Sequence, residues 1–317
     1  MPIHEVMVKA AWLYHVEGLT QAQIGERMSL TRRRVNELLA DALDSGIVRI
    51  SFSSSLAENV ELESQLRERY GLAEASIAPT PENPDLMYGV MGRVAAGLLD
   101  RMIATLRPAS LGLGWGSTLR ETVRHMSRAP LADPRMTVCS MMGGLTRGAE
   151  INTFEIVHSF AEALDAQCHY FAAPIYADSA ASRDLIAGQP VFRELLDEAA
   201  GVDLSFLSVG DVTGHSLQVR YGLPADTDVR TIVSAGGVGD LLGYYLDANG
   251  QPVDHPLNRQ AISLDLSRYR GIAHRIVVSG GRHKRAILRA VLKAGLATAI
   301  VTDADTARWL LSGKEHV

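Results

Sequence analysis

Residues 21–35 read QAQIGERMSLTRRRV, a stretch with the spacing of two short helices joined by a tight turn. Thr20 and Thr31 stand where helix N-caps are expected, because a threonine hydroxyl can accept a hydrogen bond from a backbone N–H of the first turn. The small residue Gly25 lets the two helices approach closely. This pattern predicts a helix-turn-helix, a motif whose second helix enters the major groove of DNA.

The second helix of this motif begins with three arginines, Arg32, Arg33 and Arg34. Arginine side chains in this first turn can bind guanine O6 and N7, or a phosphate. They also oppose the helix dipole, which makes them locally unfavourable until an anion arrives. The predicted contacts to double-stranded operator DNA are Gln21, Thr31, Arg32, Arg33, Arg34 and Asn36. The alternative is that the arginines form a solvated face of a generic helical bundle.

The elements around this motif complete a small N-terminal domain. Residues 4–17 predict a preceding helix, and residues 47–52, IVRISF, predict a strand that could form one arm of a wing. Leu62, Leu66 and Tyr70 then recur every four residues on a charged background, which predicts a linker helix. Its apolar seam could pack on its own chain or on a second subunit.

After residue 73 the pattern changes to short β-rich runs that alternate with helical segments, as in a largely parallel α/β sheet. Strands are expected at 110–113, 137–141, 169–171, 204–209, 275–279 and 298–301. Helices are expected at 86–106, 117–127, 153–165, 283–294 and 304–311. We therefore expect a helix-turn-helix domain at 1–54, a linker helix at 55–72, and a Rossmann-like α/β domain at 73–317.

Composition bounds the possible functions of the 317-residue chain. Its net charge of −5 does not indicate a nucleic-acid binder, and residues 1–60 carry six Lys and Arg against seven Asp and Glu. Any DNA binding therefore depends on where the cations are placed. With Cys139 and Cys168 alone, we expect no disulfide framework, no metal site and no cofactor. The absence of a signal peptide or apolar span predicts a cytoplasmic protein.

Two glycine-rich loops follow predicted strands and precede predicted helices, at residues 113–118 and 280–284. Such loops present backbone N–H groups to an anion, and the second adds Arg282 and Lys284. Neither has the P-loop spacing, so nucleotide binding is not indicated. The glycines could equally serve only as tight strand-to-helix turns.

A third glycine-rich stretch, residues 236–240, ends in the carboxylate of Asp240. A carboxylate is a natural acceptor for sugar hydroxyls, and the alternative is an ordinary surface turn. Glu150, Asp211 and His215 are further candidate acid–base groups for a sugar-phosphate isomerase or deaminase. Their positions are scattered along the sequence, so no catalytic residue is predicted and the chain is not expected to be an enzyme.

Taken together, these motifs resemble the SorC family of bacterial sugar-responsive transcriptional regulators. The resemblance rests on the helix-turn-helix stretch 21–50 and on elements that recur in the family's order: LGWGST at 113–118, Gly143-Gly144, Asn152, Ala173-Pro174, Val209-Gly210, GGVGD at 236–240 and VSGGRHK at 278–284. They cover nearly the whole chain.

This resemblance implies a sugar-isomerase-like α/β domain that binds an effector, usually a phosphorylated sugar. The implied effector-binding residues are Gly114, Gly116, Ser117, Thr118, Asp240, Gly280, Gly281, Arg282 and Lys284, with Gly280, Gly281 and Lys284 facing the phosphate. Arg282 and Lys284 favour a phosphorylated ligand over a free polyol such as erythritol, which stays the alternative. The resemblance also implies a homodimer or homotetramer that represses a carbohydrate operon, with activation as the alternative.

Overall fold

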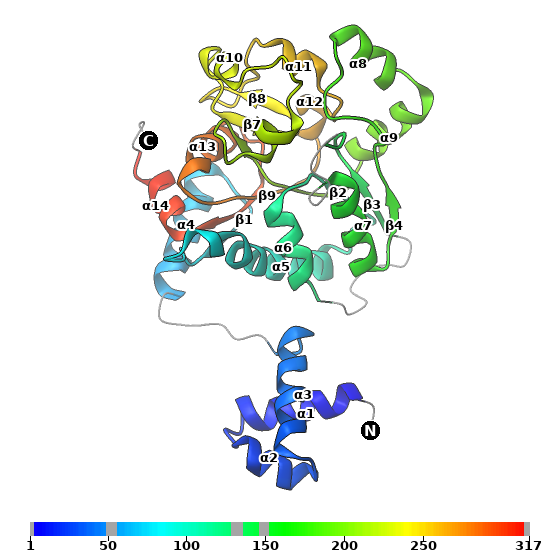
Figure 1. The fold of residues 1–317 in the computed structure, drawn as a ribbon. Coiled ribbons are helices and arrows are strands. Elements are labelled where there is room, and N and C mark those ends of the chain that lie inside the picture. The colour runs from blue at the N-terminus through cyan, green and yellow to red at the C-terminus, as the bar shows by residue number, and fades with distance from the viewer. Residues whose placement is uncertain (1–2, 49–55, 128–135, 146–151, 314–317) are drawn as a thin grey trace. The chain divides into compact units, whose positions relative to one another are not determined.

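The computed structural model describes residues 3–48, 56–127, 136–145 and 152–313. The chain divides into two compact units: a small one formed mainly by the residues before 55, and a large one that holds nearly all of the rest (Figure 1). Among the described residues, no helix is long and apolar enough to cross a membrane.

The small unit consists of three helices, α1 (Ile3–His15), α2 (Gln21–Met28) and α3 (Arg32–Asp44). Thr20 caps α2 in a reciprocal arrangement with Gln23, and the Thr31 hydroxyl accepts a hydrogen bond from the Arg34 N–H at 3.2 Å. Both predicted caps are therefore present. The core of the unit consists of Ala10, Ala11, Leu13, Ile24, Val35, Leu38, Leu39 and Ala42.

The turn between α2 and α3 is tight. Ser29 adopts the left-handed conformation with φ of 56°, and a Cβ on Gly25 would lie only 2.7 Å from the Leu30 carbonyl oxygen. Glycine at position 25 thus permits the predicted close approach. The predicted strand at 47–52 lies mostly outside the described residues, and Ile47 and Val48 form a bend.

The large unit is built on a seven-stranded parallel sheet with the order β1-β10-β9-β5-β2-β3-β4. Its strands are β1 (Glu74–Ala78), β2 (Ser110–Leu113), β3 (Thr137–Ser140), β4 (Gln167–His169), β5 (Leu204–Leu207), β9 (His274–Val278) and β10 (Ala299–Asp303). The predicted fold class is confirmed. The sequence missed β1, and it placed β4 two residues too late.

Helices cover both faces of this sheet. The α-helices described in the large unit are α4 (Leu56–Tyr70), α5 (Met87–Leu106), α6 (Ser117–His125), α7 (Thr153–Leu164), α8 (Ala180–Ala187), α9 (Pro190–Ala200), α10 (Val229–Ser234), α11 (Pro256–Gln260), α12 (Leu266–Tyr269), α13 (Arg285–Lys293) and α14 (Ala304–Leu311). One buried cluster joins α5, α6 and α7 to the sheet around Phe160 and Phe206. A second cluster joins α4, α13 and α14 to the other face around Leu66 and Ile300. Alternate residues of β9 and β10 therefore contribute to different cores.

A small antiparallel sheet consists of β6 (Gly210–Asp211), β7 (Gly239–Leu241) and β8 (Tyr244–Leu246), and β7 and β8 are drawn in yellow in Figure 1. Asp240 lies in β7 and is only 5% exposed. The alternative of a surface turn at Asp240 is therefore wrong, because the preceding glycines lead into a buried strand.

Helix α4 packs on its own chain. Leu62 and Leu66 are buried in the core of the large unit, and the Tyr70 hydroxyl donates to the Leu310 carbonyl at 3.0 Å. At the other end of the helix, Arg308 and Glu58 form an ion pair at 2.6 Å. Of the two partners considered for the seam of this helix, the structure shows the intrachain one.

The packing of α5 against α6 gives a stability prediction. Gly→Ala in a helix normally stabilises by about 1 kcal/mol. A Cβ at Gly92 would lie 2.6 Å from the Cβ of Glu121, whereas at Gly97 the nearest atom is the end of Arg101 at 3.9 Å. We expect Gly92→Ala to lower the free energy of unfolding by about 1–3 kcal/mol and Gly97→Ala to raise it slightly, as measured by urea unfolding. Equal effects of the two variants would contradict this packing.

Candidate functional site

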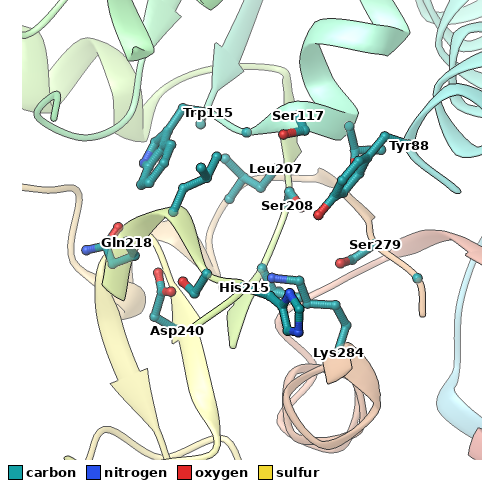
Figure 2. Close-up of a pocket in the computed structure, with 18 of the residues that line it drawn as sticks. Tyr88, Trp115, Ser117, Leu207, Ser208, His215, Gln218, Asp240, Ser279 and Lys284 are labelled. Carbon is teal, nitrogen blue, oxygen red and sulfur yellow. The ribbon is translucent and has the colours of Figure 1, made fainter. Parts of the chain in front are cut away.

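A pocket lies at the carboxyl ends of β2, β5 and β9, which are hydrogen-bonded neighbours in the parallel sheet. From β2 the chain continues to β3 and β4 on one side, whereas β5 and β9 lie on the other. This reversal of strand order is where open α/β sheets bind ligands. The pocket has an empty volume of about 730 Å³ that includes its open mouth, which suits a small molecule (Figure 2).

The loop after β2 contributes four predicted residues to the lining, Gly114, Gly116, Ser117 and Thr118. Gly116 is the N-cap of α6 with φ of 133°, and none of the described side chains caps the first turn of this helix. The N–H groups of that turn are therefore not held by a capping side chain.

In the loop after β9, only some of the predicted residues reach the pocket. Gly280 and Lys284 line it, whereas Gly281 and Arg282 are not among its described lining residues. The Gly281 N–H donates instead to the Asp303 carboxylate at 2.7 Å. The backbone donor predicted to face a phosphate is thus engaged by a carboxylate of the chain itself.

Lys284 is also paired within the chain. Its ammonium lies 2.8 Å from the Asp211 carboxylate, and the two side chains are 12% and 1% exposed. Burial by itself would raise the pKa of Asp211, but the Lys284 charge and the hydrogen bonds from Thr213 outweigh it and lower that pKa below its ordinary value. Asp211 is therefore held as a carboxylate, and its charge lies against that of the Lys284 side chain.

Asp240 is held directly over Gly210, its partner in the β6–β7 ladder. A Cβ on Gly210 would collide with the Asp240 Oδ1, so a larger residue here would displace this carboxylate. The Oδ2 atom accepts the Gly243 N–H at 3.1 Å, while Oδ1 has no partner among the described atoms. Burial raises the pKa of Asp240 to about 6, against the opposing effects of Lys284 and the Gly243 hydrogen bond.

Gln218 supplies a second unpaired acceptor. Its Nε2 donates to the Tyr176 hydroxyl at 2.7 Å, and that hydroxyl donates to the Gly243 carbonyl at 2.6 Å. These bonds fix the amide and leave the Gln218 Oε1 buried without a partner among the described atoms. Figure 2 shows Gln218 and Asp240 on the same side of the pocket, near the indole of Trp115.

Several lining residues were not among the predicted site residues. They include Tyr88 from α5, Trp115, Ser208 after β5, His215, Gln218 and Ser279. The Val209-Gly210 element was a signal for the loop after β5, but no local pattern marked Tyr88, whose pKa is raised by burial and by the charge of Asp211.

The candidate acid–base groups are less scattered than their sequence positions indicated. His215 and Asp240 line the pocket, and Asp211 binds the pocket residue Lys284. Their sequence spacing gave no sign of joint action, whereas the small antiparallel sheet brings Asp211 and Asp240 onto adjacent strands. Glu150 lies outside the described residues. In the described part of the chain, no group of three or more His, Cys, Asp or Glu side chains could hold a metal ion.

The predicted DNA-contacting residues share one region of the small unit. The Gln21 amide donates to the Asn36 side chain at 3.1 Å. Glu37 accepts hydrogen bonds from Arg34 at 3.0 Å and from Arg33 at 3.1 Å. Both bonds lower the pKa of Glu37, and the bond from Arg34 has the larger effect. Arg32 is exposed, and the Arg33 side chain is 91% exposed.

Comparisons with known proteins cover both units. Residues 54–312 match the family described as "Putative sugar-binding domain", and residues 8–45 match sigma-70 region 4. The chain is 29% identical over 304 residues to the erythritol catabolism regulatory protein EryD of Brucella abortus, covering 96% of this chain and 95% of that protein. It is also 29% identical to the transcriptional regulator LsrR of Escherichia coli K12, covering 97% and 94%.

The fold is similar to that of a solved regulator. The full-length sorbitol operon regulator SorC of Klebsiella pneumoniae superimposes with a TM-score of 0.73 at 24% identity, covering 97% of this chain and 99% of that one. The resemblance to SorC regulators is confirmed by these findings.

The buried Asp240 gives a prediction about pH and stability. Between about pH 4 and pH 6 the native state keeps a proton that the unfolded state has lost, so stability falls as pH rises through this window. We expect Asp240→Asn to remove a penalty on the order of 3 kcal/mol at pH 7.5 and to have little effect at pH 4, as measured by urea unfolding. Asp226→Asn, at an exposed site, is the control. A pH-independent difference between wild type and Asp240→Asn would contradict the buried carboxylate.

Proposed function

We propose that the chain, which belongs to the sugar-binding-domain family of transcriptional regulators, is a repressor of a carbohydrate or polyol catabolic operon. Its affinity for double-stranded operator DNA would be set by a small effector bound in the pocket. The observation that carries this proposal is the pocket itself, which lies at the reversal of strand order and contains two buried acceptors without partners among the described atoms.

The effector is a small polyhydroxylated compound. Serine hydroxyls from three different loops, an amide and a carboxylate line the pocket together with the Trp115 indole. Such a mixture of polar and apolar groups fits a sugar or a polyol. The relative named for erythritol catabolism supports this class of compound. The sequence favoured a phosphorylated sugar, with a free polyol as the alternative, and the titration panel below includes both classes.

The DNA-reading surface is the N-terminal end of α3 together with Gln21. Thr31, Arg32, Arg33, Arg34 and Asn36 are the other proposed contacts. A single small unit offers few of these contacts, and its net charge gives no general attraction for DNA. We therefore infer that the protein acts as a homodimer or homotetramer, in which the small units of two subunits bind two half-sites of the operator.

The proposal is tested by titrating the full-length protein against fluorescent DNA from upstream of its gene, with and without erythritol, sorbitol and sugar phosphates. We expect selective binding that one compound weakens at least tenfold, which corresponds to a coupling free energy of about 1.4 kcal/mol. A compound that strengthens binding would support an activator instead. Absence of selective binding with every compound would contradict the regulator.

The arginines of α3 give a second prediction. Changing Arg32, Arg33 and Arg34 to Ala should weaken operator binding. The slope of log affinity against log salt concentration should also become less steep, by about 0.9 for each DNA phosphate that the protein no longer neutralises. Glu37→Gln should act in the opposite direction, because it releases Arg33 and Arg34 from their ion pairs. Both effects are measured by fluorescence anisotropy over a series of salt concentrations. Unchanged salt dependence in the triple variant would exclude the proposed surface.

A further inference from the structure

We infer that the pocket selects an uncharged polyol over its phosphorylated counterpart. The inference rests on the proposed function for the location of the effector, and it goes further in naming the ligand class. It follows from the charges in the pocket, from the state of its predicted phosphate-binding loop, and from the kind of hydrogen-bonding atom that the pocket leaves unpaired.

The charge balance of the pocket does not favour an anion. Lys284 is the only Lys or Arg among its described lining residues. The charge of Lys284 is already compensated by Asp211 at 2.8 Å, inside the protein where solvent screens little. Asp240 adds a second carboxylate to the lining. A phosphate dianion would therefore enter a site with no uncompensated cation of Lys or Arg among the described lining residues.

The loop after β9 offers little to a phosphate. Its Gly281 N–H is engaged by the Asp303 carboxylate, whose other oxygen accepts hydrogen bonds from the Thr306 N–H and the Thr80 hydroxyl. This network occupies the Gly281 N–H, so that donor is not free for an anionic ligand. The first turn of α6 remains as a donor, and it can donate to a hydroxyl oxygen as well as to a phosphate.

The unpaired atoms of the pocket are acceptors. The Asp240 Oδ1 and the Gln218 Oε1 are buried without partners among the described atoms, and both residues line the cavity. An unpaired buried acceptor is stabilised only by a donor. At the phosphorylated end of a sugar phosphate the dianion has no donor, whereas the remaining hydroxyls of that compound, like every hydroxyl of a polyol, have one O–H and two lone pairs. Hydroxyl groups can thus satisfy both the acceptors and the α6 donors.

The carbon skeleton of such a ligand also has partners. Trp115 and Leu207 lie on one side of the pocket in Figure 2, and Met87, Met91 and Met142 complete an apolar part of the lining. Apolar side chains of this kind pack against the C–H groups of a polyol and exclude water from its hydrogen bonds.

The test compares matched pairs of ligands on the full-length protein by titration calorimetry. The pairs are sorbitol with sorbitol 6-phosphate, and ribose with ribose 5-phosphate, and erythritol is added as a short polyol. We expect one neutral compound to bind at least about tenfold more tightly than any phosphate, a difference of one to two hydrogen bonds. Tighter binding of a phosphate, or no binding of any neutral compound, would overturn the inference.

Two variants make the test specific to the pocket charges. Asp211→Asn keeps the shape of the side chain and frees the charge of Lys284, so it should strengthen phosphate binding about tenfold or more relative to the neutral partner. Gln218→Met removes one acceptor and should weaken binding of the neutral compound about tenfold. Thermal melting of both variants checks that they fold. An equal ratio of neutral to phosphorylated ligand affinity in wild type and Asp211→Asn would contradict the role of the Lys284–Asp211 ion pair.

The DNA titration separates this inference from the proposed function. If a phosphate binds most tightly and releases the operator, the regulator stands and the inference fails. If sorbitol, ribose or erythritol binds the pocket in preference to phosphates but leaves DNA affinity unchanged, the ligand class stands and the proposed function fails.

Discussion

The parallel pairing of β9, β5 and β2 is the constraint on which the site depends. Parallel strands have their carboxyl ends at one edge of the sheet, so the three loops that follow these strands meet although they are far apart in the sequence. The loop after β2 supplies a helix N-terminus, the loop after β9 supplies Lys284, and the loop after β5 leads into the small antiparallel sheet with Asp211 and Asp240. Without this alignment the same residues would have no common neighbour.

Buried polar groups in this site are of two kinds. Lys284, Asp211, Gly281 and Asp303 are paired with one another within the chain, which fixes the loops but leaves them little capacity for an anion. Asp240 and Gln218 keep oxygens that are unpaired among the described atoms, which cost stability in the unliganded protein. These two oxygens are therefore placed to accept hydrogen bonds from a bound compound.

Sequence reasoning located the local features well. The caps at Thr20 and Thr31, the buried stripe of α3 and the loop before α6 follow from spacing and side-chain chemistry within a few residues. It missed β6, β7 and β8, because strands of two or three residues leave no periodic pattern. It gave no sign that Lys284 pairs with Asp211, since that carboxylate belongs to a distant segment that only the fold brings close.

Glu37 has a kinetic consequence for the proposed DNA reading. It holds Arg33 and Arg34 together at the exposed end of α3, so each encounter with a phosphate backbone has to compete with an acceptor that is always present. This competition lowers the affinity for random and specific DNA sequences alike. On random DNA, phosphate contacts supply nearly all of the binding free energy, so the dwell time there becomes shorter. A regulator with shorter dwell times on random DNA scans a chromosome faster before it meets its operator.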